Sequence, residues 1–325
     1  MSTTTASAKQ LLVDKRLLLV VGLAVVAVYP FLFTAWHTDL VTRILILAIF
    51  GIGFNIAFGF TDLASFGHAA FYGLGAYGVA MTITYASPEM LAIPIIIGIA
   101  AAVVYGIITA WFSTKGRGIY FALITFAFAQ LLYEVFLRWT EVTGGSEGQF
   151  FSLPTVFGID FGSTMTMYYL TFVVFAIVAV AGYRLINSPF GNVMKAIRHN
   201  EDRASAIGYP VRRVKVTVFT ISSGIAAVAG VLHAMNNRFV SPEVMFFEMS
   251  IEVLVISIIG GAAYFTGPIV GAAIFIVLHE FTRDLADVGI VITGIIFVIV
   301  IMFLPEGVVG YTKEKLRSAG ILEDE

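Results

Sequence analysis

Long apolar stretches recur along this chain, separated by short polar segments. Eight runs have about the 20 mostly apolar residues that a helix needs to cross a bilayer. They are Leu17–Trp36, Val41–Phe60, Ala69–Tyr85, Leu91–Phe112, Ile119–Leu137, Met167–Ile186, Val216–Met235 and Ile290–Leu304. The pattern predicts an all-α, polytopic helical membrane protein.

One further apolar stretch, Ile251–His279, is too long for a single ordinary span. Four residues that weaken a helix interior interrupt it: Gly260, Gly261, Gly267 and Pro268. We therefore predict two shorter helices, Ile251–Ala263 and Pro268–Thr282, joined by Tyr264–Gly267. With this broken pair the chain has about ten membrane segments.

The basic residues are unevenly shared between the predicted loops. If the N-terminus is cytoplasmic and the ten segments alternate, four basic residues lie outside: Arg43, Arg138, Arg238 and Arg283. The other 15 of the 19 Lys and Arg residues lie inside, which agrees with the bias of positive charge toward the cytoplasm. A single span over Ile251–His279 would move the basic C-terminal cluster outside. The charges therefore favour the broken pair and predict that both termini are cytoplasmic.

This topology divides the chain into a cytoplasmic tail (1–16), a transmembrane domain (17–310) and a second cytoplasmic tail (311–325). The largest outer loop covers 138–166 and the largest inner loop covers 187–215. Leu17–Phe33 follows two basic residues as a signal peptide does, but no small-residue cleavage site follows it. We therefore expect a retained first span.

Composition agrees with the apolar pattern and excludes several classes of protein. Of 325 residues, 59% are hydrophobic and 12% are charged, whereas soluble domains carry about 25% charged residues. A soluble enzyme could not bury so much apolar surface. The net charge of −2 leaves no basic surface for nucleic acid, so no nucleic-acid partner is expected. Cysteine is absent, and we expect neither disulfides nor a thiolate metal site.

The inner loop 187–215 carries start and stop signals for two short helices. Ser188 followed by proline is typical of a helix N-terminus, and this helix should end near His199. Asn200 can cap a second short helix, and Gly208 ends it. Small apolar residues rimmed by charges of both signs suit either lipid headgroups or a groove in a partner protein. Spacing alone leaves both interpretations open.

The sequence of this loop also carries a family resemblance. Ala196-Ile197-Arg198-His199-Asn200-Glu201-Asp202-Arg203-Ala204-Ser205-Ala206-Ile207-Gly208 resembles the cytoplasmic coupling segment of ABC-importer permeases, in particular the branched-chain amino-acid (Liv-type) permeases. Four further stretches match in the same order: Gly53–Asn55 running into Ser65–Tyr77, Arg117–Ala122, Thr143–Gly148, and Gly260-Gly261 with Gly267–Gly271. The resemblance covers about Ile44 to Gly310 and is greatest to the larger of the two permease types.

The resemblance implies one half of a translocation pore in the cytoplasmic (plasma) membrane. A second permease subunit forming a heterodimer, two ATPase subunits and an external solute-binding protein would complete the importer. No G-x-x-x-x-G-K-[ST] phosphate loop is present, so we expect no catalytic residue and no cofactor in this chain, with ATP and Mg²⁺ bound by the ATPase partners. The implied ATPase-coupling residues are Ala196, Arg198, Asn200, Glu201, Asp202, Arg203, Ala204 and Gly208.

Polar and glycine residues near the spans are candidates for the substrate pathway. They are Asn55, Ser65, Gly67, His68, Tyr120, Thr125, Gln130, Gly260 and Gly261. Ser65–His68 opens a helix whose free amides could bind a carboxylate, although capping and close packing explain the same residues. The topology places this turn near the cytoplasmic side. Four ionisable residues near span ends are expected to reach water: His233, Glu252, His279 and Glu280.

The glycine-rich part of the outer loop provides another group of candidates: Gly144, Gly145, Ser146 and Glu147. Glu147 could accept an ammonium group from a ligand, with glycine amides facing it. A simple turn beneath the binding protein explains the same residues, and we favour it because an exposed carboxylate needs no partner.

The sequence and the resemblance leave three functions to be tested. The first is import of branched-chain amino acids by alternating access, with urea or short amides as alternative substrates. The second is an ion-coupled secondary carrier that works without ATPase partners. The third, a membrane-embedded enzyme, is disfavoured because the spans contain no carboxylate pair or nucleophile–base arrangement at depth.

Overall fold

The computed structural model describes residues 29–86, 90–156, 158–282, 291, 294–295, 297–299 and 302–318. The predicted first span up to residue 28, six of the fifteen residues of Ile290–Leu304, Arg283 and the N-terminal tail lie outside these residues. The last seven residues of the C-terminal tail lie outside them as well.

Eight helices of the described residues correspond to eight of the ten predicted membrane segments. They are α2 (Ala35–Thr61), α3 (His68–Ala86), α4 (Ala92–Ser113), α5 (Ile119–Arg138), α7 (Thr164–Ile186), α10 (Val211–Asn237), α11 (Phe247–Gly260) and α12 (Gly267–Thr282). Of these, α2, α4, α5, α7 and α10 are long and apolar enough to cross a membrane. The helical membrane class predicted from the sequence is therefore supported.

The boundaries differ most at two helix starts. The α2 helix begins at Ala35, six residues before the predicted start, and so includes the end of the predicted first span. The α10 helix begins at Val211 rather than Val216, directly after Pro210. The first turns of this helix contain basic residues, which are compatible with a helix. A hydropathy pattern detects only the apolar section, so it could not predict that the helix begins earlier.

The helix α2 lies at the centre of the bundle. Within its most apolar stretch 89% of residues are buried, against 28% for α4 and α5 and 17% for α7. Glycines let neighbouring helices approach closely. A Cβ atom on Gly75 would lie 2.1 Å from the Ala227 carbonyl oxygen, and one on Gly230 would lie 1.8 Å from the Tyr72 carbonyl oxygen. Helices α2, α3 and α10 therefore form the core, and α4, α5 and α7 present large apolar side chains outward.

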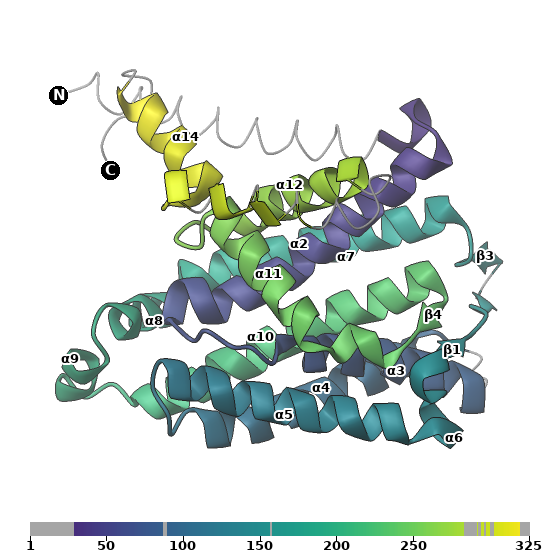
Figure 1. Ribbon diagram of the computed structural model, residues 1–325, viewed down its shortest axis with the longest axis horizontal. Coiled ribbons are helices and arrows are strands. Elements are labelled where there is room, and N and C mark those ends of the chain that lie inside the picture. The colour runs from purple at the N-terminus through teal and green to yellow at the C-terminus, as the bar shows by residue number, and fades with distance from the viewer. Residues whose placement is uncertain are drawn as a thin grey trace.

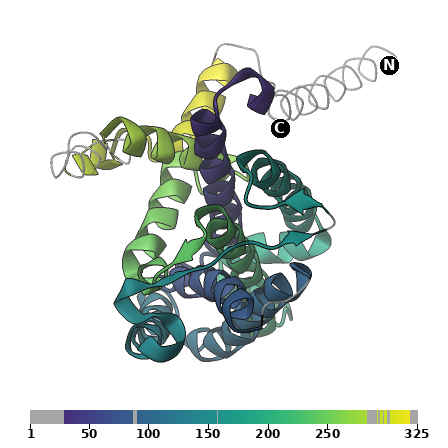
Figure 2. The same ribbon diagram turned by 90° about the vertical axis from the view of Figure 1, so that its right-hand side faces the viewer.

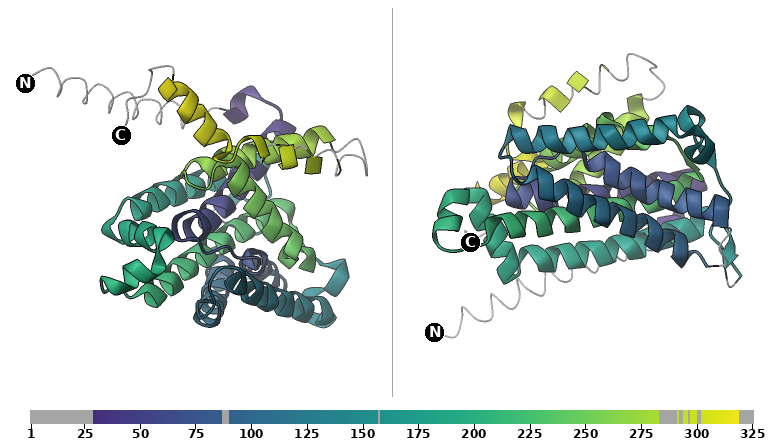
Figure 3. Two further views of the ribbon diagram at one scale, coloured as in Figure 1. Left: turned by 60° about the vertical axis from the view of Figure 1, so that its left-hand side comes forward. Right: turned by 90° about the horizontal axis from the view of Figure 1, so that it is seen from below.

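The two ends of the bundle differ in structure (Figure 1). At one end, called here the helical-loop end, α8 (Pro189–His199) and α9 (Glu201–Ala206) project from the bundle (Figure 3). The other, called here the strand end, carries α6 (Thr140–Thr143), η1 (Gly145–Glu147), β1 (Gln149–Phe150), β2 (Thr155–Val156), β3 (Ile159–Asp160) and β4 (Phe239–Val240). Three of the four basic residues predicted to lie outside belong to the strand end, and the fourth lies outside the described residues.

Two antiparallel strand pairs organise the strand end (Figure 2). Strand β1 pairs with β4, with Gln149 opposite Val240, and β2 pairs with β3. The first pair ties the outer loop to the connection between α10 and α11. Each strand has only two residues, so no alternating pattern in the sequence could reveal it.

Two helices begin inside the bundle rather than at its ends. The chain leaves α2, turns at Asp62 and enters the bundle before α3 starts, while η2 (Pro242–Met245) leads in from the strand end to α11. The two starts meet where the Ala69 amide donates to Ser250 Oγ at 2.9 Å. The Phe66 amide donates to Thr125 Oγ1 at 3.2 Å, and Thr125 lies about 9 Å along α5. This turn is therefore deeper in the bundle than the predicted position near the cytoplasmic side.

The long apolar stretch after residue 250 is divided as the sequence predicted. Helix α11 ends at Gly260 and α12 begins at Gly267. A Cβ on Gly260 would lie 1.8 Å from the Gly267 carbonyl oxygen, and Gly261 has a φ of +110°. The break therefore requires glycine at both positions. After it, α14 (Gly307–Ser318) covers the break and extends into the predicted C-terminal tail.

Candidate functional site

The two short helices of the inner loop begin and end where the sequence predicted. Ser188 Oγ accepts a hydrogen bond from the Gly191 amide at 3.2 Å, and Asn200 Oδ1 accepts one from the Arg203 amide at 2.8 Å. Gly208 has a φ of +94°, a conformation that side chains rarely adopt. These local bonds fix the turn between α8 and α9 and the exit from α9 without help from other elements.

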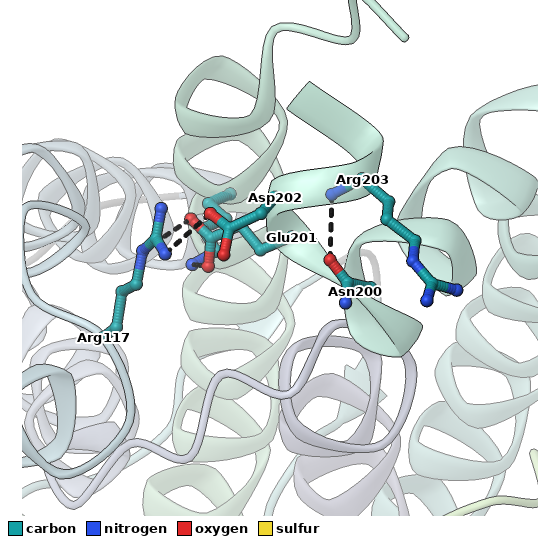
Figure 4. A network of polar contacts seen from close by, with 6 residues as sticks. Arg117, Asn200, Glu201, Asp202 and Arg203 are labelled. Carbon is teal, nitrogen blue, oxygen red and sulfur yellow. Dashed lines mark hydrogen bonds and ion pairs between the residues drawn. The ribbon is translucent and has the colours of Figure 1, made fainter. Parts of the chain in front are cut away.

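An ion-pair network ties α9 to two other elements (Figure 4). Glu201 pairs with Lys215 on α10 at 2.5 Å, and the Lys215 side chain is only 7% exposed. Arg117, on the α4–α5 loop, reaches Asp202 at 2.9 Å and Glu201 at 3.5 Å. The hydrogen bond to Asp202 and the charge of Glu201 raise the pKa of Arg117. The acidic first turn of α9 is therefore paired within the chain.

A third connection joins α8 to the central helix. The Arg198 guanidinium donates to the carbonyl oxygen of Gly59, near the end of α2. Ile197 and Ala204 are buried beneath the two short helices, whereas Ala196 is half-buried and Arg203 and Gly208 are exposed. Arg198 and the residues of the ion-pair network thus hold the two-helix unit against α2, α10 and the α4–α5 loop.

Beside this unit lies an open groove of about 760 Å³. It is lined by Trp111, Arg117, Glu201, Ser205, Tyr209, Pro210, Val211, Arg212, Arg213, Val216 and Thr217. Ile207 is 73% exposed near it. Arg212 stacks over the Trp111 ring at 4.2 Å and donates to its carbonyl oxygen at 3.0 Å. An exposed apolar side chain beside a groove with charged walls is typical of a surface that binds a protein partner.

The predicted pathway residues Ser65, Gly67, His68 and Thr125 come together inside the bundle. The Gly67 amide donates to Ser65 Oγ at 3.2 Å, and His68 Nε2 lies 2.7 Å from Ser222 Oγ. His68 also packs edge-on against three phenylalanine rings. Because the amides of Phe66, Gly67 and Ala69 already have acceptors, the geometry favours capping and packing over carboxylate binding at this turn.

Asn55, Gly260 and Gly261 gather separately, at the helix break. Asn55 Nδ2 donates to the Tyr264 carbonyl oxygen at 3.3 Å. Its Oδ1 atom is buried without a hydrogen-bond partner among the described residues. The amide thus satisfies one carbonyl that the break leaves outside a helix.

The remaining pathway candidates do not join either group. Tyr120 is 70% exposed on the outer face of α5, and Gln130 is half-buried on the same helix. Neither contacts the His68 cluster through any bond that the described residues make. The three polar candidates on α5 therefore do not form one continuous polar stripe.

The outer-loop candidates form a tight turn at the strand end. Residues Gly144 and Gly145 both have positive φ, and Ser146 and Glu147 are exposed in η1. Thr143 Oγ1 accepts a hydrogen bond from the Gly145 amide at 3.2 Å. The geometry is that of the glycine-rich turn favoured from the sequence.

A cavity of about 290 Å³ near the strand end collects residues that the sequence assigned to span ends. It is lined by Arg43, Ile46, Leu47, Tyr72, His233, Asn236, Asn237, Met249, Glu252, Phe275, Ile276 and His279. They come from five different helices, so no local motif could have grouped them. The available signal was the spacing of Arg43, Ile46 and Leu47, which places one charge and two aliphatic side chains on one face of α2.

Comparisons with known proteins agree with the resemblance. The profile of the family described as “Branched-chain amino acid transport system / permease component” matches residues 37–305. The chain is 29% identical to the “High-affinity branched-chain amino acid transport system permease protein LivM” of Escherichia coli (strain K12). It is 28% identical to the protein of the same name in Salmonella typhimurium. Each of these two matches covers 94% of this chain and 77% of the relative. It is 23% identical to the “Probable branched-chain amino acid transport permease protein LivH” of Methanocaldococcus jannaschii, over 84% of this chain and 91% of the relative. No match to this chain was found among solved structures.

Proposed function

Since this chain belongs to the family of branched-chain amino acid transport system permease components, we propose that it is the membrane subunit of an ABC importer that moves branched-chain amino acids into the cell. The family match over residues 37–305 carries the proposal. The projecting α8–α9 unit supports it, because it presents a surface beside a groove where an ATPase partner could bind, and this sequence contains no phosphate loop.

The α8–α9 unit is suited to transmit a movement of an ATPase partner to the helices of the bundle. One partner subunit would contact the exposed side of α9 and the groove beside it. Movement of α9 would reach α10 through Lys215, the α4–α5 loop through Arg117, and α2 through Arg198. These three contacts therefore link the α8–α9 unit to the central helix α2, to α10 and to the α4–α5 loop. Alternating access would then follow from movement of these elements relative to the rest of the bundle.

The proposed assembly contains this chain, a second permease subunit, two ATPase subunits that bind ATP and Mg²⁺, and an external solute-binding protein. This chain itself would need no cofactor. Relatives named LivM and LivH occur at 29% and 23% identity, which supports a heterodimer in which this chain is the LivM-like partner. The assembly would lie in the cytoplasmic membrane, with the helical-loop end and both termini in the cytoplasm.

The test is uptake of radiolabelled leucine by cells that express the whole importer and have no other leucine importer. Substituting Glu201→Ala and Gly208→Ala together should abolish both uptake and permease-stimulated ATP hydrolysis. Asn192→Ala, an exposed change on α8 that lies outside the groove, should leave both unchanged. Uptake that persists after deletion of the ATPase subunits would instead favour an ion-coupled carrier. Uptake of urea in place of leucine would contradict the proposed substrate.

The orientation has a separate test, because this chain contains no cysteine. Ser205→Cys should react with a membrane-impermeant maleimide only after the cells are permeabilised. Ser146→Cys, at the strand end, is the matched control and should react in intact cells. The reverse labelling pattern would overturn the proposed orientation.

A further inference from the structure

The cavity near the strand end lies where a substrate delivered from outside would enter the chain. It is walled by the core helices α2, α3 and α10 together with α11 and α12. Its volume of about 290 Å³ is close to the lower end of the range for small-molecule sites, ~300–1,000 Å³. One lining ring, Tyr72, packs against the Phe50 ring at 4.8 Å between centroids, and both rings are fully buried. The cavity is therefore closed on the side of Tyr72 by groups of this chain.

One part of the wall is apolar. Ile46, Leu47, Met249, Phe275 and Ile276 contribute aliphatic, thioether and aromatic surface from three helices. Such a wall makes the transfer of a branched aliphatic side chain from water favourable, because each methylene group it buries leaves contact with water. Uncharged polar solutes such as urea would gain nothing from it.

The other part of the wall is polar and incompletely satisfied. Glu252 is half-buried, and no ion pair to it exists among the described residues. The Tyr72 hydroxyl is fully buried and has no hydrogen-bond partner among those residues. Buried polar groups without partners are rare in proteins. The buried Tyr72 hydroxyl without a partner, beside a half-buried carboxylate without an ion pair, points to a ligand that supplies donors.

Basic and amide groups complete the polar wall. Arg43 is held by Asp39 at 2.8 Å, and Asp39 also accepts from Asn236 at 2.9 Å. One ion pair uses part of the five N–H donors of a guanidinium, so Arg43 can still bind a carboxylate. His233 and Asn237 lie beside it and contact each other. The wall thus offers both an acidic and a basic partner, as a zwitterion requires.

We propose that this cavity is a binding site for the transported amino acid within the permease, an inference that rests on the proposed function. The ammonium group would bind Glu252 and the Tyr72 hydroxyl, and the carboxylate would face Arg43. The aliphatic side chain would lie against the apolar wall formed with Met249 and Phe275. The site selects for an aliphatic α-amino acid because both ends of the zwitterion and the side chain find complementary surface.

The first test measures protection of a cysteine placed in the cavity of the assembled importer. Ile276→Cys puts a thiol on the apolar wall, and its reaction with a small methanethiosulfonate reagent should slow at least about tenfold in saturating leucine. 4-Methylpentanoate, which lacks only the ammonium group of leucine, should give no protection. Equal protection by both compounds would overturn the role of Glu252, and no protection by leucine would overturn the site.

The second test distinguishes loss of leucine binding at the cavity from a general loss of folding or activity. Glu252→Gln should weaken leucine protection about tenfold or more, the loss expected for a charge-assisted hydrogen bond, and should raise the KM for uptake. Glu248→Gln is the matched control, because Glu248 lies one turn away on the same helix and is exposed. Equal effects of the two changes would overturn the proposal.

The two tests also keep the site and the proposed function apart. If both glutamate variants and the parent chain take up leucine normally but leucine never protects the thiol introduced by Ile276→Cys, the site is wrong while the proposed function stands. Absence of ATP-dependent uptake in the parent chain would instead overturn the proposed function.

Discussion

The acidic residues of α9, at the helical-loop end, and of the cavity near the strand end differ in whether they have an ion-pair partner. At the helical-loop end Glu201 and Asp202 are both ion-paired, with Lys215 and Arg117. In the cavity near the strand end, Glu252 has no ion pair among the described residues, and the Tyr72 hydroxyl there has no hydrogen-bond partner. Burial alone does not explain the difference, since Glu201 and Glu252 are both half-buried.

The difference indicates what each end is built to do. Ion pairs hold α9 in a fixed position relative to the bundle. A fixed position is needed where the movement of a partner has to be transmitted to the bundle. A half-buried carboxylate without an ion pair lowers stability in the free protein, and a ligand that supplies the missing charge offsets this effect. The difference supports the proposals that the helical-loop end connects the bundle to a partner and that the cavity binds a ligand.

The largest expected effect comes from the break between α11 and α12. In Gly260→Val the new Cβ would meet the Gly267 carbonyl oxygen at 1.8 Å and the Gly271 amide at 3.0 Å. Neither group can move without separating α11 from α12, so we expect a loss of about 3 kcal/mol or more of folding free energy and a collapse of the cavity as well. Thermal unfolding in detergent, followed by size-exclusion chromatography, measures it. Gly294→Val is the control, because nothing lies within 4 Å of its Cβ position, and an equal loss there would contradict the packing argument.

A second pair of substitutions compares the two ends directly. Glu201→Gln leaves the Lys215 ammonium, only 7% exposed, without its counter-charge, and should cost about 2 kcal/mol. Glu252→Gln removes a half-buried charge that has no ion pair among the described residues, and should leave stability unchanged or raise it. The same unfolding measurement on both variants tests the comparison. Equal destabilisation by the two changes would show that Glu252 is a structural residue like Glu201.

The sequence predicted the helical-loop end well because its signals are local. Ser188 and Asn200 cap helices through amides three residues away, and Gly208 ends α9 through its own backbone conformation. Capping preferences are properties of a few neighbouring residues. The break between α11 and α12 was predictable for the same reason, since glycine and proline disturb a helix wherever they occur.

The cavity and the interior helix starts could not be predicted in this way. Glu252, Tyr72 and Arg43 lie on three helices far apart in the sequence, and only packing brings them together. Likewise, the depth of the turn before His68 depends on bonds to Thr125 and Ser250. A hydropathy pattern gives the order of the spans, but it contains no information on which faces meet or how deeply a connection enters the bundle.

A third and smaller effect is expected between the two ends, at His68. Ser222 Oγ lies 2.7 Å from His68 Nε2 and also donates to the Gly53 carbonyl oxygen at 2.6 Å. In Ser222→Ala a buried ring nitrogen loses its partner, and His68 Nδ1 already has none among the described residues. We expect a loss of about 1–2 kcal/mol. Ser223→Ala is the control, because that hydroxyl donates to the Thr220 carbonyl oxygen of its own helix. If both ends still work normally in Ser222→Ala but the protein is less stable, His68 is a packing residue and not part of the pathway.

Substitution of Arg117 should have the smallest effect on stability. Its effect on transport gives the most direct functional comparison of the helical-loop end with the strand end. The Arg117 side chain is 62% exposed, and exposed ion pairs contribute little to stability because water screens them. Arg117→Gln should therefore lower stability only slightly, and the difference should vanish near 1 M salt, where the screening length falls to about 3 Å. Arg138→Gln removes a similar pair at the strand end, Arg138 with Glu134 at 3.0 Å, and should change stability by as little. If the helical-loop end transmits force, only Arg117→Gln should lower the uptake driven by each ATP hydrolysed, since Arg117 joins α9 to the α4–α5 loop. Equal coupling ratios in the two variants would mean that this ion pair does not transmit movement from α9 to the bundle.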